Sequence, residues 1–174
     1  MANKLISLID SDPCVSLEEA RKHLRMEGTT HDNTYITELC SAAQRYVEKS
    51  TKTAIFHQSR KTITRNQRDI RLAYPPFLLV QSVTVDGTPT TEYDVYEDTL
   101  VPSLRMKKDP GSSPVVVTYI CGYEDDHPED LKHAIKLVIA TLYENRESVV
   151  TGTITSKIPN AVMMIMKKYE VIRL

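Results

Sequence analysis

The chain has 174 residues, which fits one domain or a small domain with an insertion and is too short for several independent catalytic modules. Hydrophobic residues make up 41% and charged residues 26%, so the composition excludes a disordered or fibrous protein. Lys and Arg (22) balance Asp and Glu (23), and the net charge of -1 provides no overall positive field for tight nonspecific binding to nucleic acid.

The three cysteines and the start of the chain bear on the cellular compartment. Cys14, Cys40 and Cys121 lie far apart and are odd in number, which argues against a disulfide framework and a Cys-x-x-Cys metal site and favours a reducing compartment. The start of the chain lacks the apolar stretch of a signal peptide, and no apolar run reaches the roughly 18 residues of a membrane span. We expect a soluble protein without a classical secretory signal and without a membrane partner.

Two helices are predicted near the start of the chain. Ser16 and Glu19 form a capping-box pattern, in which each side chain satisfies a backbone amide, and a helix from about Leu17 to Met26 follows. Polar turn residues from Gly28 to Asp32 interrupt the helical pattern. Apolar residues then recur every three or four positions and predict a second helix from about Asp32 to Ser50, which packs on the first as a hairpin.

Between Thr53 and Cys121 the composition changes to Thr, Val, Ile and Tyr with prolines and turn signals, which is typical of β structure. Pro75-Pro76 is expected at a sheet edge or corner, Asp86-Gly87 at a tight turn, and residues 109–114 in a surface loop. The expected strands run from Ala54 to Thr64, Ile70 to Tyr74, Leu79 to Val85, Glu92 to Tyr96, Leu100 to Met106 and Val115 to Ile120.

Two more helices are predicted in the last third of the chain. Asp126 or His127 with Pro128 has the chemistry of a helix start, and the wide apolar face that follows predicts the central helix of the fold. The small polar residues from Thr151 to Ser156 predict a flexible loop, after which Pro159 opens a short helix that ends near Tyr169.

The order of elements predicts an α+β fold, a small helical bundle with an inserted antiparallel β subdomain. We expect residues 1–174 to form a single connector-like domain, in which residues 53–121 are the β insertion. Residues 151–174 are expected to form a mobile C-terminal arm.

The motifs of common enzymes are missing from the sequence. It contains no Gly-rich phosphate loop, no Gly-x-Ser-x-Gly elbow and no His-Glu-x-x-His signature, so we assign no catalytic residue, cofactor or metal site. Acidic residues between Glu124 and Asp130 could hold a hard cation, and a metal-dependent hydrolase centred on Asp125, Asp126 and His127 is one rival hypothesis. Capping of the third helix by these carboxylates is the stronger interpretation.

A second rival hypothesis is a small nucleic-acid-binding protein that uses the first helical hairpin and basic residues on the strands. The start of the second helix, however, carries one acidic residue and no Arg or Lys, which is a poor match for a base-reading helix. Solvated strand faces are the more common explanation for such charges. The basic residues in question are Lys61, Arg65, Arg68, Arg71, Arg105, Lys107 and Lys108.

The last predicted helix is a candidate interface. Its methionines are flexible and polarizable and can repack against a partner, although packing in the core of the monomer is an equally good explanation. The residues that we assign to a candidate interface are Met163, Met164, Ile165, Met166 and Tyr169 in this helix, and Lys107 and Lys108 beside the surface loop.

Nearly the whole chain, from about Val15 to Tyr169, follows the pattern of a known family. The matching segments are Val15-Ser16-Leu17-Glu18-Glu19-Ala20 with Leu24; Ile36, Ala42-Ala43 and Tyr46-Val47-Glu48; Pro75-Pro76, Val80-Gln81-Ser82-Val83 and Tyr93-Asp94; and Val117-Thr118-Tyr119, Gly122-Tyr123, Pro128, Leu131, Ala134-Ile135 and Leu142-Tyr143-Glu144-Asn145-Arg146-Glu147. In these segments the chain resembles the head-tail connector, or adaptor, proteins of tailed bacteriophages and prophages.

The resemblance implies a non-enzymatic virion protein that forms a ring beneath the portal protein, extends the DNA channel and presents a surface to a tail-completion protein. It also implies self-association as a dodecamer, contact with passing genomic DNA without sequence specificity, and no cofactor. The implied location is the head-tail junction of the virion, reached from the host cytoplasm during virion assembly and DNA packaging.

Overall fold

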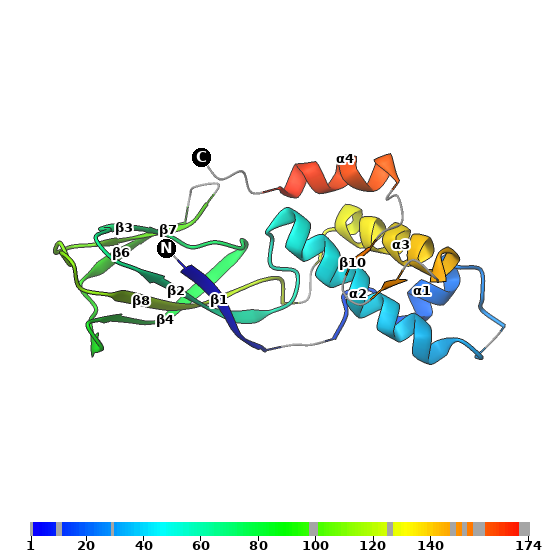
Figure 1. Ribbon diagram of the computed structural model, residues 1–174, viewed down its shortest axis with the longest axis horizontal. Helices are drawn as coiled ribbons and strands as arrows, with labels where there is room; N and C mark the ends of the chain where they lie inside the picture. Colours follow the sequence, from blue (N-terminus) through cyan, green and yellow to red (C-terminus); the bar gives the residue numbers. More distant parts are fainter. Residues whose placement is uncertain are drawn as a thin grey trace. The chain divides into compact units, whose positions relative to one another are not determined.

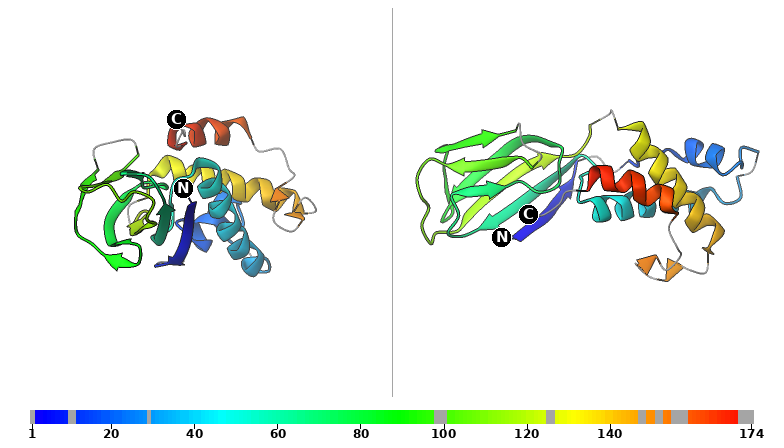
Figure 2. Two further views of the ribbon diagram at one scale, coloured as in Figure 1. Left: turned by 60° about the vertical axis from the view of Figure 1, so that its left-hand side comes forward. Right: turned by 90° about the horizontal axis from the view of Figure 1, so that it is seen from above.

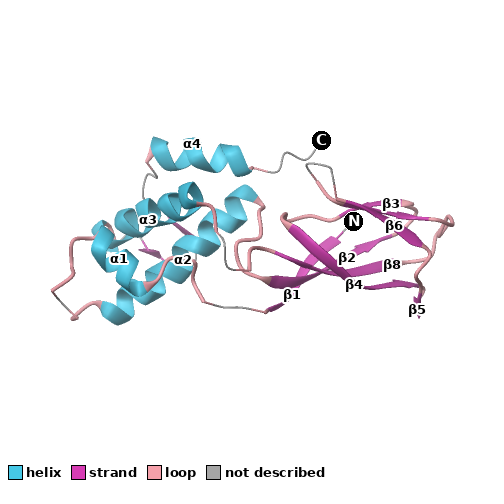
Figure 3. Ribbon diagram, turned by 180° about the vertical axis from the view of Figure 1, so that it is seen from behind, coloured by secondary structure: helices cyan, strands magenta, loops and turns pink. Residues whose placement is uncertain are grey.

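The computed structural model describes residues 2–9, 12–28, 30–97, 101–124, 127–146, 149–150, 153–154 and 159–170. These residues form two compact units, each of which is built from segments distant in the sequence (Figure 1). The β unit lies within residues 1–11 and 52–125, and the helical unit lies within residues 12–51 and 126–170. Among the elements described, all four helices belong to the helical unit (Figure 3). The predicted α+β class, a helical bundle with an antiparallel β subdomain, is therefore confirmed.

Four helices and one short hairpin make up the helical unit. The bounds are α1 Leu17–His23, α2 Asn33–Thr51, α3 Glu129–Glu144 and α4 Asn160–Tyr169, with β9 (Val149–Val150) paired antiparallel to β10 (Thr153–Ile154). The predicted helices are all present. The predicted helix start at Asp126 and most of the predicted loop from Thr151 to Ser156 lie outside the described residues.

The capping box predicted at the start of α1 is present. The Ser16 hydroxyl accepts from the Glu19 amide at 3.2 Å, and the Glu19 carboxylate accepts from the Ser16 amide at 2.9 Å. The predicted end at Met26 is wrong, since α1 ends at His23. Arg25 adopts a left-handed conformation, and the Met26 amide donates to the Arg21 carbonyl at 2.9 Å, which closes the helix by a Schellman-type turn.

The central helix of the helical unit is α3, as predicted. Six apolar residues along the helix are buried, and α3 contacts each of the other three helices. These residues are Leu131, Ala134, Ile135, Val138, Ile139 and Leu142. Such a wide apolar face requires cover on several sides, which the surrounding helices provide (Figure 2, yellow helix).

Two antiparallel sheets form the β unit. The five-stranded sheet has the order β1-β2-β8-β4-β5, and the three-stranded sheet has the order β3-β7-β6. The bounds are β1 Ala2–Leu8, β2 Gln58–Thr64, β3 Asp69–Arg71, β4 Phe77–Val85, β5 Thr88–Pro89, β6 Tyr93–Tyr96, β7 Ser103–Met106 and β8 Val115–Cys121. The inner faces enclose one core, to which β8 contributes Val115, Val117, Tyr119 and Cys121.

The N-terminal strand β1 was not predicted. It pairs with β2 at the edge of the five-stranded sheet and is anchored by Asn3, whose amide donates to Thr62 Oγ1 at 2.8 Å and to the Tyr119 hydroxyl at 2.7 Å. The buried Arg60 guanidinium donates in turn to Asn3 Oδ1 at 2.9 Å. One polar side chain on β1 thus satisfies several buried polar groups of the sheet.

Strand boundaries differ from the prediction where backbone amides donate to loop carbonyls and not to a neighbouring strand. The strand expected from Ala54 begins only at Gln58, because the preceding segment is a buried connection whose Ala54 amide donates to the Pro75 carbonyl at 2.8 Å. Pro75-Pro76 forms the predicted corner between β3 and β4, and Asp86-Gly87 the predicted tight turn between β4 and β5. The expected start at Leu100 lies outside the described residues.

Candidate assembly surfaces

The helix α4 divides the methionine-rich segment into a core side and a solvent side. Val162 is fully buried, and α4 packs on α2 and α3. Met163 and Met164 are 52% and 75% exposed, which is unusual for side chains of this size and polarity. Ile165 and Met166 are half-buried. Core packing and contact with a partner, the two explanations of this helix, therefore apply to different residues. Val162 packs in the core, and Met163 and Met164 are the better candidates for contact with a partner.

Tyr169 and Lys168 hold the end of α4 on the first turn of α3. Lys168 Nζ lies 2.6 Å from Asp130 Oδ2, and the Tyr169 hydroxyl donates to Asp130 Oδ1. The Lys168 and Tyr169 hydrogen bonds hold the pKa of Asp130 below its ordinary value. Tyr169, which the sequence assigned to the candidate interface, is thus engaged within the helical unit.

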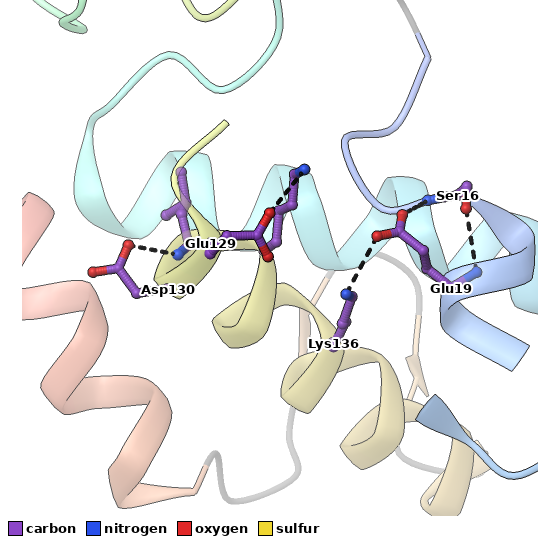
Figure 4. A network of polar contacts seen from close by, with 7 residues as sticks. Ser16, Glu19, Glu129, Asp130 and Lys136 are labelled. Carbon is purple, nitrogen blue, oxygen red and sulfur yellow. Dashed lines mark hydrogen bonds and ion pairs between the residues drawn. The ribbon is translucent and has the colours of Figure 1, made fainter. Parts of the chain in front are cut away.

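The acidic start of α3 belongs to a network of structural contacts (Figure 4). Asp130 Oδ1 accepts from the Leu131 amide at 3.0 Å, and Glu129 pairs with Lys132 at 3.3 Å. Lys136, one helical turn further on, lies 3.3 Å from Glu19 at the start of α1 and so ties the two helices together. These contacts give the carboxylates of Glu19, Glu129 and Asp130 partners within the helical unit.

Within the part of the chain that the structure describes, no three His, Cys, Asp or Glu side chains are grouped as a metal site. Asp125 and Asp126, on which the hydrolase hypothesis depends, lie outside that part. Burial raises the pKa of the Cys14 thiol to about 12 and that of Cys40 to about 11. Neither thiol is therefore ionised near neutral pH, as a nucleophilic cysteine has to be.

In the β unit, Lys107 and Lys108 follow β7. Lys107 Nζ lies 3.7 Å from Asp94 Oδ1, and its amide donates to the Glu92 carbonyl at 3.0 Å, so this lysine helps to join β6 and β7. Lys108 is exposed. The structure does not bring these two lysines together with the α4 methionines in one unit, and each surface is considered by itself.

Several basic side chains of the nucleic-acid hypothesis have partners inside the β unit. Arg105 Nε lies 2.5 Å from Asp69 Oδ1, and the Arg68 guanidinium donates to the carbonyls of Met106 and Lys107. A side chain that is paired in this way has less charge and fewer donors to offer a phosphate. This arrangement does not favour a phosphate-binding surface.

Sequence reasoning missed one surface, the outer face of the five-stranded sheet. Ile63 is paired with Val116, and Leu79 is paired with Ile120, with all four side chains directed away from the core between the sheets. We call these four residues the apolar sheet face. A signal was available, because two of the three outward residues of Val115–Cys121, Val116 and Ile120, are apolar where an alternating strand would carry polar residues.

None of the helices described has the length and apolar character needed to cross a membrane.

The comparisons with known proteins bear on the fold. No protein-family model and no curated protein matches the chain. Solved structures do match over its whole length: a chain of the neck of an empty gene transfer agent particle computed with C6 symmetry has 20% identity and a TM-score of 0.79, covering 100% of this chain and 97% of that chain.

Two further structures agree with the first. A chain from the virion of a native gene transfer agent particle has 19% identity and a TM-score of 0.78, and one from the neck of the native particle computed with C12 symmetry has 17% identity and a TM-score of 0.76. Each alignment covers 100% of this chain and 97% of the other. The resemblance to head-tail connectors is thereby confirmed at the level of the fold: the chain is built like proteins from the neck of gene transfer agent particles.

Proposed function

We propose that the chain is a structural, non-enzymatic component of the head-tail junction of a bacteriophage or prophage particle, where copies form a ring adaptor beneath the portal protein. The observation that carries this proposal is the likeness over 100% of the chain, at a TM-score of 0.79, to a neck chain in a particle computed with C6 symmetry. Symmetry of this kind requires copies of one chain around an axis, and a closed ring requires two different surfaces on each copy.

In this proposal, residues 1–174 act as one connector-like domain with residues 53–121 as its β insertion. Twelve copies surround and extend the DNA channel, consistent with the C12 symmetry of a similar neck. The net charge of -1 suits such a channel, because a strongly basic lining would retain passing DNA through counterion release. The ring assembles in the host cytoplasm and remains in the virion.

The C-terminal arm, residues 151–174, is proposed to dock on the portal protein through the exposed face of α4. Met163 and Met164 offer apolar side chains that repack readily, and burial of the area that each still exposes contributes about 1 to 2 kcal/mol. The surface around Lys107 and Lys108 is proposed to face the tail-completion protein.

Native mass spectrometry of the full-length chain, alone and mixed with the portal protein encoded nearby, tests the proposal. We expect a closed ring, of twelve copies, or a portal-bound ring, with ring formation rising steeply once closure becomes possible. Persistence of the monomer under both conditions over a wide concentration range would contradict it.

Two substitutions test the assignment of α4. Met164→Glu places a charge on the exposed face and is expected to weaken portal binding while the monomer stays folded. Thr37→Glu, at an exposed position of α2, adds the same charge elsewhere and is expected to leave portal binding unchanged. Equal portal binding by both variants would exclude α4 as the docking element.

The nucleic-acid alternative predicts a different result. Fluorescence anisotropy with duplex DNA should show only weak binding that disappears at moderate salt if the chain is a ring adaptor. Submicromolar affinity for duplex DNA at physiological salt would favour the nucleic-acid-binding function over the ring adaptor.

A further inference from the structure

The apolar sheet face is ordered by the register of the strands. The pair Ile63 and Val116 forms one cross-strand row, and the pair Leu79 and Ile120 forms another. Between them lies a polar row that begins at Lys61 on β2. Ile63 is 39% exposed and Leu79 is 49% exposed, so both retain a large apolar area in contact with water.

The outer face of the three-stranded sheet has the opposite character. Asp69, Arg105 and Asp94 are cross-strand neighbours there, and they form a row of alternating charge across β3, β7 and β6. Such a face is typical of a solvated sheet. The β unit therefore has one outer face suited to water and one with two apolar rows.

Nothing in the described part of the β unit covers the apolar sheet face, because that part contains no helix and its second sheet packs on the inner face. The apolar sheet face lies on β2, β8 and β4, and β8 has seven residues, so these three strands present an area about 24 Å long and about 14 Å wide, or about 340 Å². This is about two fifths of the roughly 800 Å² that each partner buries in a standard interface. A second copy of the chain can cover such an area with part of one unit.

The charges within this sheet surface indicate which part of the second copy fits. Lys4 and Lys61 are cross-strand neighbours in the polar row between the two apolar rows, and like charges in this position repel each other unless a carboxylate lies near. Strand β6, an edge strand of the other sheet, is flanked by exposed Glu92 and Glu97 and carries Tyr96, which is 46% exposed. Tyrosine and a complementary charge are common at specific interfaces.

From these observations we infer that the apolar sheet face is the contact between neighbouring copies in the ring, covered by the β6 edge of the next copy. The inference rests on the proposed function, since it names the surface by which the ring closes. The two surfaces are distinct patches on one unit, so the contact is heterologous and can be repeated around an axis. An isologous pairing of the sheet faces would instead end at a dimer and would bring four lysines together.

The first test compares a substitution on the apolar sheet face with the same introduced charge elsewhere in the full-length chain. Leu79→Glu is expected to raise the concentration at which the ring is half-formed by at least about tenfold, whereas Thr37→Glu, at an exposed position of α2, is expected to leave it unchanged. Native mass spectrometry measures the ring, and circular dichroism with thermal unfolding verifies that both variants fold. A second apolar-face variant, Ile63→Glu, substitutes for Leu79→Glu if the latter fails to fold.

The second test reverses one charge on each of the two surfaces, Lys61 in the polar row of the sheet and Glu97 at the β6 edge, which we take to face each other across the contact. Lys61→Glu and Glu97→Lys are each expected to weaken the ring, and their combination is expected to restore at least half of the lost association. Lys49→Glu, an exposed lysine on α2, makes the same charge change as a control and should have no effect.

The outcomes separate this inference from the proposed function. A wild-type chain that forms no ring alone or with the portal protein overturns both. If the wild type forms a ring and Leu79→Glu forms it equally well, the apolar sheet face is not the contact between copies, and the proposed ring adaptor is unaffected. Loss of the ring without rescue by the double reversal overturns the assignment of the β6 edge.

Discussion

Gly122 is the position at which a single methyl group is expected to disturb the β unit most. It follows β8 with a φ of +107°, and a Cβ built on it would lie 2.0 Å from the Phe56 carbonyl oxygen and 2.7 Å from the carbonyl carbon. Those atoms belong to the backbone of a buried segment, so no side chain can rotate away. Gly122→Ala therefore requires both a strained backbone conformation and a displacement of residues 54–57.

The two effects can be assigned approximate magnitudes. A positive φ at a non-glycine residue costs about 1 to 2 kcal/mol. Overpacking of a well-packed segment costs about 1 to 3 kcal/mol. We expect Gly122→Ala to lower the free energy of unfolding by about 2 to 5 kcal/mol, a large share of the about 5 to 15 kcal/mol that stabilises a typical domain.

Gly87→Ala is the matched control for this prediction. Gly87 also has a positive φ, +79°, but no atom lies within 4 Å of the position that a Cβ would take there, so only the conformational cost of about 1 to 2 kcal/mol applies. Urea unfolding followed by circular dichroism measures both variants. If Gly122→Ala were no more than about 1 kcal/mol worse than Gly87→Ala, the contact with Phe56 would not be the tight packing that the structure indicates.

Three further predictions concern the anchors of single elements. Asn3→Ala removes the amide that joins β1 to the buried tyrosine of β8 and is expected to cost about 1 to 3 kcal/mol in urea unfolding, whereas Lys4→Ala on the same strand should be nearly neutral. Asp130→Asn removes the charge that holds α4 and is expected to speed amide exchange in α4, whereas Glu129→Gln, which pairs within α3, should not. Because folding lowers the pKa of Asp130, its contribution to stability is present above the ordinary value of 3.8 and is lost as the pH falls through the folded-state pKa, so the protection of the α4 amides relative to their intrinsic exchange rate should also fall in acid. Val162→Ala is expected to lower the free energy of unfolding by about 1 to 3 kcal/mol, measured by thermal unfolding. Met163→Ala, at the exposed neighbouring position, is expected to lower it by less than about 0.5 kcal/mol.

The elements that could be predicted from the sequence are those set by neighbouring residues. The Ser16 and Glu19 capping box and the helix opened by Pro159 depend on contacts within a few positions, and both are present. The end of α1 was placed too late because nothing in the sequence marks Arg25 as a left-handed residue, a conformation that glycine usually supplies.

Strand β1 could not be predicted because its stability comes from distant residues. Its partner residues on β2 lie 50 to 61 positions away, and the register shifts between Leu5 and Ser7, which breaks the alternation by which a strand is recognised. Leu5 and Ile6 are 40% and 51% exposed, so the positions of the apolar residues in β1 do not indicate a buried face of the strand either. The backbone ladder with β2 and the buried polar groups that Asn3 satisfies explain why this segment joins the sheet.

The candidate interface was found in sequence only as a segment, and its division between core and surface follows from packing. Residues 161–166 are apolar at every position, so helical periodicity cannot show which side of α4 faces α3. The structure places Val162 in the core and leaves Met163 and Met164 exposed, while Asp130 holds the far end of the helix. Because different residues serve these purposes, a partner can cover the two methionines without removing Val162 from the core. Folding of the monomer and docking of α4 are therefore compatible, and a substitution at Met164 separates them.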